Sequence, residues 1–117
     1  MTIQGDSWFR QDDFSAKVTR GDNGFVVVCL AGQFDLSTAE DLRESLASSQ
    51  VLDAPRVRVD LGEVTFLDSS GIGLLVGACK RVRSAGGTFS TSCGDGPARR
   101  ILEVAGLIEY LQVEDVL

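Results

Sequence analysis

The apolar run Phe25–Ala31 is the feature that most constrains the fold of this chain. It is rich in β-branched residues and shows no alternation of apolar and polar positions. Such runs are typical of strands that are covered on both faces, so we expect a central strand of a sheet here. Residues 14–19 alternate between apolar and polar side chains, as a half-buried strand does. The Asn-Gly pair within Gly21–Gly24 is a strong hairpin signal between the two.

A first helix is predicted after this strand. Ser37–Glu40 has the S-x-x-E form of a capping box, in which the Ser37 oxygen accepts from the backbone near Glu40 and Glu40 reaches back. Apolar positions recur at helical spacing from residue 39 to residue 47. The helix should therefore start at Ser37 and end before Pro55.

Strand and helix patterns then alternate to the end of the chain. Residues 56–61 alternate as a strand, residues 62–68 are interpreted as a connection, and a second helix is predicted from Ser70 or Gly71 to residue 85. A short strand at 88–92, a third helix that begins near Pro97 and a short strand at 110–113 follow. This ββαβαβαβ order predicts a single α/β domain: a mixed, mostly parallel β-sheet with covering α-helices.

The first 13 residues lack a sustained period. We interpret residues 1–13 as an N-terminal tail that docks through Trp8 and Phe9. The folded domain is accordingly expected to begin near Phe14 and to span residues 14–117.

The composition excludes several functional classes. The chain carries 17 acidic and 11 basic residues, and this net charge of −6 opposes direct binding of nucleic acid, which needs a basic footprint. It has no histidine, so serine triads, Cys-His pairs and histidine-based zinc sites are excluded. No apolar stretch approaches the roughly 18 residues of a membrane span, and the opening residues do not resemble a signal peptide. We therefore expect a cytoplasmic protein with no membrane partner.

The three cysteines, Cys29, Cys79 and Cys93, show no C-x-x-C spacing. An odd, unclustered set fits reduced thiols better than a disulfide framework or a zinc site. We interpret them as small core residues, with a redox switch through Cys79 and Cys93 as the alternative. Neither a metal nor a cofactor is expected, because an apolar run separates two of the acids between Asp60 and Asp68 from the third.

The acidic excess lies in the first part of the chain. Twelve of the 17 acids but only six of the 11 bases lie at or before Asp68, and the two kinds balance after it. Between residues 80 and 100, five basic residues face only Asp95. We interpret Arg99 and Arg100 as solvated helix charges and assign them no site.

The sequence Asp68-Ser69-Ser70-Gly71 carries the most chemical information. It joins a predicted strand to a predicted helix, at the edge of an open α/β sheet where ligands commonly bind. Free N–H groups and the positive end of the helix macrodipole favour a phosphate there, so a phosphoserine can be accommodated. The structural alternative is that one serine caps the helix, Asp68 favours the dipole and the glycine permits a tight turn. A nucleotide loop is disfavoured because the phosphate-binding lysine pattern is missing.

A helical projection divides the second predicted helix into two faces. One face, expected to pack on the sheet, contains Ile72, Leu75, Val76, Cys79 and Val82. The other side contains Gly73, Leu74, Gly77 and Arg81. An exposed Leu74 flanked by two glycines predicts a surface that a partner approaches closely, although a single exposed leucine is also an ordinary surface residue.

Residues 59–75, followed by Lys80-Arg81 and Gly86-Gly87, resemble the signature of STAS domains and, more narrowly, of bacterial anti-sigma factor antagonists. The segment Gly32–Asp35 with the following Ser37–Glu40 resembles the G-x-x-D segment of that family. Residues 97–107 resemble its third helix. The resemblance extends from about residue 14 to residue 113.

The resemblance implies a protein that binds an anti-sigma factor with serine kinase activity and thereby frees a sigma factor. In that family the anti-sigma kinase phosphorylates the serine directly after the aspartate, here Ser69 with Ser70 as the fallback. This phosphorylation abolishes binding, and a serine phosphatase restores it. Asp35 falls at the acidic position that takes part in partner recognition. The expected partner-binding residues are Asp35, Asp68, Ser69, Ser70, Gly71, Gly73, Leu74 and Gly77.

The function expected from these observations is binding and not catalysis, by a protein that is a monomer when free. One alternative is a STAS adaptor subunit of a membrane transport or signalling complex that is not phosphorylated. A nucleotide-binding or hydrolysing module is a third possibility.

Overall fold

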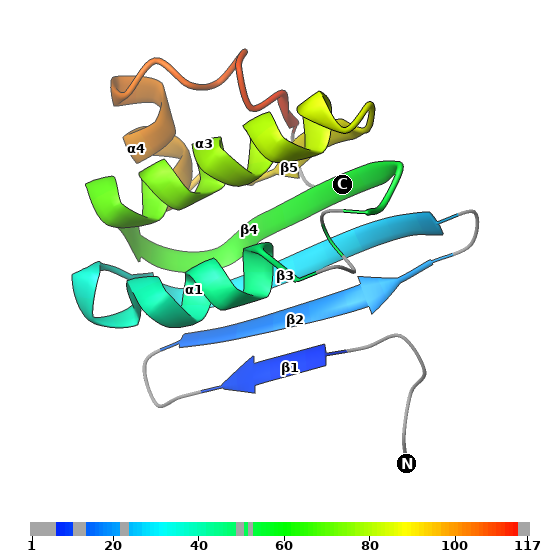
Figure 1. The fold of residues 1–117 in the computed structure, drawn as a ribbon. Helices are drawn as coiled ribbons and strands as arrows, with labels where there is room; N and C mark the ends of the chain where they lie inside the picture. The colour runs from blue at the N-terminus through cyan, green and yellow to red at the C-terminus, as the bar shows by residue number, and fades with distance from the viewer. Residues whose placement is uncertain (1–6, 11–13, 22–23, 49–50, 52, 115–117) are drawn as a thin grey trace.

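The computed structural model describes residues 7–10, 14–21, 24–48, 51 and 53–114. Six strands form one sheet in the order of the sequence (Figure 1). They are β1 (Ser7–Arg10), β2 (Phe14–Arg20), β3 (Phe25–Phe34), β4 (Arg56–Leu67), β5 (Thr88–Ser92) and β6 (Val113–Glu114). The helical elements are the 3-10 turn η2 (Leu36–Thr38) and the helices α1 (Ala39–Leu46), α3 (Ser69–Ser84) and α4 (Pro97–Val104).

The direction of the strands divides the sheet into two parts. Strand β2 is antiparallel to both of its neighbours, β1 and β3, whereas β3, β4, β5 and β6 run parallel to one another. Each of the parallel pairs β3–β4, β4–β5 and β5–β6 is joined through a helix, as parallel connections require. The predicted mixed, mostly parallel α/β sheet is therefore confirmed.

Helices α1 and α3 lie side by side across the sheet (Figure 1). The core between sheet and helices contains alternate residues of the strands, such as Val26, Val28 and Leu30 of β3, and the buried residues Leu42 and Leu75 of the two helices. No helix in the described part of the chain is long and apolar enough to cross a membrane.

The central position of Phe25–Ala31 is confirmed, because β3 is hydrogen-bonded to β2 on one side and β4 on the other. Its expected burial on both faces is only partly correct. Val26 and Val28 are buried, whereas Val27 and Cys29, which point to the opposite face, are half-buried. The β-branched run therefore has one core face and one face that is partly open to solvent. The hairpin between β2 and β3 is present, but Asp22 and Asn23 of its predicted turn lie outside the described residues.

The expectation that structure begins near Phe14 is wrong for Ser7–Arg10. These residues form an edge strand that pairs antiparallel with β2, with Ser7 opposite Val18 and Arg10 opposite Ser15. An edge strand can pair through its backbone without any regular alternation of apolar and polar residues. The sequence pattern therefore did not reveal this strand. The side chains of Trp8 and Phe9 lie outside the description, so their predicted docking stays a prediction.

The predicted connection 62–68 is also wrong, because β4 continues to Leu67. The parallel register with β3 shifts between Cys29 and Ala31 and again between Gly32 and Gln33. These irregularities break the alternation of buried and exposed side chains, and thus the period from which a strand is recognised. The last strand is likewise displaced, to Val113–Glu114.

Candidate functional site

The candidate site lies where β3 and β4 end together. Phe34 and Leu67 are register partners in these parallel strands, and the Asp68 backbone N–H donates to the Phe34 carbonyl at 3.1 Å. The next residues, Asp35 and Asp68, therefore leave the sheet from adjacent strands, which are spaced by roughly 5 Å. Residues that are 33 positions apart in the sequence are thus brought to one edge of the sheet.

Asp68 caps helix α3. One carboxylate oxygen, Oδ1, accepts from the backbone N–H groups of Ser70 at 2.8 Å and Gly71 at 3.2 Å. The structural alternative in which a serine caps this helix is therefore wrong, and the helix begins at Ser69. Because the aspartate accepts from two free N–H groups of the first turn, neither serine hydroxyl is needed as the cap.

Replacing Asp68 with alanine is expected to lower the free energy of unfolding by about 1 kcal/mol, because two backbone donors lose their partner. Asp68→Asn should retain most of this stability, since an amide oxygen also accepts. Asp95→Ala is the matched control, because Asp95 is exposed and has no hydrogen bond within the described residues. Denaturant titration measures all three variants. An equal loss in Asp68→Ala and Asp95→Ala would contradict the capping role.

The two serines differ in accessibility. Ser69 is exposed and Ser70 is half-buried. Within the described part of the chain, the Ser69 hydroxyl makes no hydrogen bond. Ser69 is therefore the more accessible of the two to an enzyme that acts on this loop.

Asp35 organises the turn after β3. Its carboxylate accepts from the backbone N–H of Ser37 at 2.9 Å and from the Ser37 hydroxyl at 2.6 Å. The Asp35 backbone N–H donates to the hydroxyl oxygen of Thr38 at 3.0 Å. The hydrogen bonds, chiefly that from the Ser37 hydroxyl, hold the pKa of the Asp35 carboxyl below its ordinary value, so this group is ionised at neutral pH.

These contacts correct the predicted capping box. The reciprocal pair is Asp35 with Thr38, around the 3-10 turn, and not Ser37 with Glu40. Glu40 instead pairs with Arg43 one turn further along α1. A carboxylate at position 35 reaches the first free N–H groups before Ser37 does, so the cap lies two residues earlier than predicted and the helical segment starts at Leu36 in a 3-10 form.

Gly71 has a packing role. It is buried, and a Cβ built on it would lie 2.6 Å from Leu67 Cδ1 and 3.2 Å from the Phe34 carbonyl oxygen. The absence of a side chain lets the first turn of α3 approach the ends of both strands. Gly71 thus allows the loop Asp68–Gly71 to lie close to the ends of β3 and β4.

The other predicted partner-binding residues of α3 lie along a groove. Gly73, Leu74 and Gly77 line it together with Arg81 of the same helix and two residues of α1, Arg43 and Ala47. The groove has a volume of about 310 Å³. Leu74 is half-buried and packs against the core, so its expected exposure is only partly correct. It forms part of the apolar floor of the groove.

Two exposed apolar side chains flank the site and were not singled out from the sequence. Leu36, which follows Asp35, is 78% exposed, and Phe66, two residues before Asp68, is 44% exposed. Both lie close in sequence to the acidic edge, and exposed large apolar groups beside polar ones are typical of protein interfaces. The exposure of Leu36 could have been predicted from the sequence, because it is an apolar residue between two polar residues that favour turns, Asp35 and Ser37.

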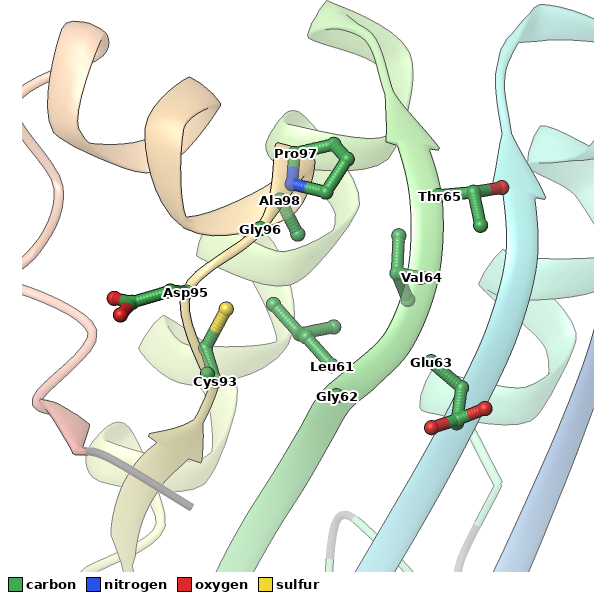
Figure 2. A pocket seen from close by; sticks show the side chains of 11 residues that line it. Leu61, Gly62, Glu63, Val64, Thr65, Cys93, Asp95, Gly96, Pro97 and Ala98 are labelled. Carbon is green, nitrogen blue, oxygen red and sulfur yellow. The ribbon is translucent and has the colours of Figure 1, made fainter.

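A second cavity, of about 210 Å³, lies between β4 and the segment that leads from β5 into α4 (Figure 2). Its walls include Leu61, Val64 and Ala98, and the carboxylates of Glu63 and Asp95 point away from it (Figure 2). None of the described residues that line it is basic. This lining offers no charge complement to a nucleotide phosphate, and the nucleotide-binding alternative finds no support here.

Two of the three cysteines are core residues, as the sequence predicts. Cys79 and Cys93 are buried, Cys29 is half-buried, and all three are free thiols. Burial raises the pKa of each thiol, which keeps it protonated and weakly nucleophilic at neutral pH.

The Arg99 side chain is not simply the solvated charge that the sequence predicted. Its guanidinium donates to the Cys93 carbonyl at 3.2 Å and lies 3.7 Å from the Glu103 carboxylate. No cluster that could hold a metal ion occurs within the described residues.

Comparisons with known proteins agree on one family. The family model described as STAS domain matches residues 16–117. The chain is 29% identical to an anti-sigma-B factor antagonist of Listeria monocytogenes, over 89% of this chain and 91% of that protein. It is 30% identical to the anti-sigma-B factor antagonist of Bacillus subtilis, over 75% and 80% respectively. A solved anti-sigma factor antagonist from Mycobacterium paratuberculosis superposes with a TM-score of 0.80 at 27% identity, over 92% of this chain and 91% of that one.

Proposed function

The chain belongs to the STAS domain family, and from this premise we propose that it is an anti-sigma factor antagonist controlled by phosphorylation of Ser69. Its relatives named as anti-sigma-B factor antagonists align over most of both chains, which supports the antagonist role. In this role the protein binds an anti-sigma factor and so frees a sigma factor for RNA polymerase. The activity is binding, and the chemistry at Ser69 is carried out by a partner kinase and reversed by a serine phosphatase.

The observation that carries the proposal is the exposed Ser69 hydroxyl beside the Asp68 cap. Ser69 is the first residue of α3, and the Asp68 carboxylate already accepts from Ser70 and Gly71. A kinase can therefore reach the hydroxyl without unfolding the helix. The half-buried Ser70 is the fallback phosphoacceptor.

Phosphorylation would change the charge of this surface without changing the fold. A phosphoserine adds about −1.5 to −2 charges. It would follow directly after Asp68, near the strand end that presents Asp35, and the backbone N–H groups of Ser70 and Gly71 are already engaged by Asp68. The added charge is thus directed outward, where it repels an acidic partner surface and lowers its affinity.

Phosphosite mapping tests this proposal. The wild-type protein, used as bait, first recovers the anti-sigma factor, which is identified by mass spectrometry and purified. With ATP, this partner should phosphorylate the wild-type protein and Ser70→Ala but not Ser69→Ala, while Ser69→Ala keeps binding. Undiminished phosphate incorporation in Ser69→Ala would refute the Ser69 assignment. Recovery of membrane transport subunits in place of an anti-sigma factor would favour the adaptor alternative.

A further inference from the structure

The groove between α1 and α3 has features that folding alone does not require. Two helices line it, and its lining includes Leu74, Ala47 and the two glycines Gly73 and Gly77. Neither glycine has a positive φ, so neither is needed for an unusual backbone conformation. A glycine inside a helix costs about 1 kcal/mol relative to alanine.

Steric need inside the protein does not explain these glycines either. A Cβ built on Gly73 would meet no atom within 4 Å. One built on Gly77 would meet only the guanidinium of Arg81, with Nη1 at 3.5 Å, which is ordinary contact with a flexible group. Gly71 of the same helix, by contrast, is required by its neighbours at 2.6 and 3.2 Å. The open space above Gly73 and Gly77 is therefore available to a backbone or side chain from outside.

The phosphoacceptor lies on the same row of α3 as three residues of the groove. Ser69, Gly73, Gly77 and Arg81 follow one another at intervals of four residues, so they form one stripe along α3. The stripe extends roughly 18 Å along the helix axis at 1.5 Å per residue. A partner element that lies along this stripe would contact the groove and the Ser69 loop at once.

The charge of the groove favours a carboxylate. Arg43 is engaged by Glu40 of its own helix. Arg81 is exposed and has no ion pair within the described residues, and its guanidinium lies over Gly77 at the edge of the groove. The unbalanced charge that faces an occupant is thus positive and belongs to Arg81.

We propose that the groove receives a helix of the anti-sigma factor, which packs small or apolar side chains against Gly73 and Gly77 and places a carboxylate against Arg81. This inference rests on the proposed function and specifies the chemistry of the partner. A groove between helices accepts a third helix by interdigitation, and glycines in it permit close approach of the two backbones.

The test measures the affinity of the purified anti-sigma factor for the non-phosphorylated protein by calorimetry. Arg81→Glu is expected to weaken binding by about tenfold or more, since it removes an interfacial charge pair and opposes like charges. Lys80→Glu is the matched control: it makes the same charge change at an exposed neighbour outside the groove and should alter affinity by less than about threefold. Gly77→Leu, which fills the groove, should weaken binding by about tenfold or more without lowering the thermal midpoint.

Replacement of the contacting carboxylate of the anti-sigma factor with arginine should restore binding to Arg81→Glu. Equal effects of Arg81→Glu and Lys80→Glu, or stronger binding by Arg81→Glu, would overturn the proposal, the latter indicating a basic occupant. Self-association that Gly77→Leu abolishes would assign the groove to a second copy. If Ser69→Asp weakens binding but Gly77→Leu and Arg81→Glu do not, the groove is not the binding site, while the proposed role of Ser69 stands. Absence of any wild-type binding would refute the antagonist role itself.

Discussion

Ser69→Asp is expected to weaken binding to the anti-sigma factor by about 100-fold, which corresponds to about 2.7 kcal/mol. The physical reason is a negative charge placed in a desolvated interface next to Asp35 and Asp68. The fold should not suffer, because an acidic residue at the first position of a helix interacts favourably with the macrodipole. Calorimetric titration and thermal unfolding of the same sample separate the two effects.

Ser69→Asn is the matched control for this charge. Asparagine has nearly the shape of aspartate but no charge, so Ser69→Asn should bind within about threefold of the wild type. High salt should recover part of the affinity of Ser69→Asp, since exposed charges are screened over about 8 Å at physiological ionic strength and over shorter distances above it. Equal loss in both variants would show that steric exclusion, and not charge, operates at Ser69.

Gly71→Val is expected to destabilise the protein by about 3 kcal/mol through overpacking. Even the Cβ of the new side chain would lie 3.2 Å from the Phe34 carbonyl oxygen, and backbone cannot move aside as a flexible side chain does. For a domain of this size, such a loss lowers the thermal midpoint by about 10 °C.

Gly73→Val, two residues further along α3, is the control for Gly71→Val. The same substitution there meets open space and is exposed, so the free energy of unfolding should change by less than about 0.5 kcal/mol or rise. Similar losses in the two variants would contradict the contact with Phe34 and Leu67 as the cause of the effect at Gly71.

The order of elements and the central strand were predictable from the sequence because they follow from the period of apolar residues. The full length of β4 was not, because the register shifts opposite Ala31 and Gln33 interrupt that period. Strand β1 was missed for a related reason: its place at the edge of the sheet depends on backbone pairing with β2, which leaves no apolar signature.

The chemistry of the site was predictable in part. The Asp68-Ser69-Ser70-Gly71 sequence indicated the loop, but the choice of cap depends on which oxygen reaches the free N–H groups, and the structural interpretation of the sequence named a serine where the structure has Asp68. The role of Gly71 depends on Phe34, which is 37 residues away, and the groove depends on the packing of α1 against α3. Such contacts between distant segments have no local sequence signal.

The most direct test of the proposed switch is a titration of the purified anti-sigma factor, loaded with its sigma factor, with two forms of this protein. One form is non-phosphorylated and the other carries phosphate on Ser69 alone. The proposal predicts that the non-phosphorylated form binds the anti-sigma factor and releases the sigma factor, and that the phosphorylated form does neither. Equal release of the sigma factor by both forms, or release by neither, would contradict it.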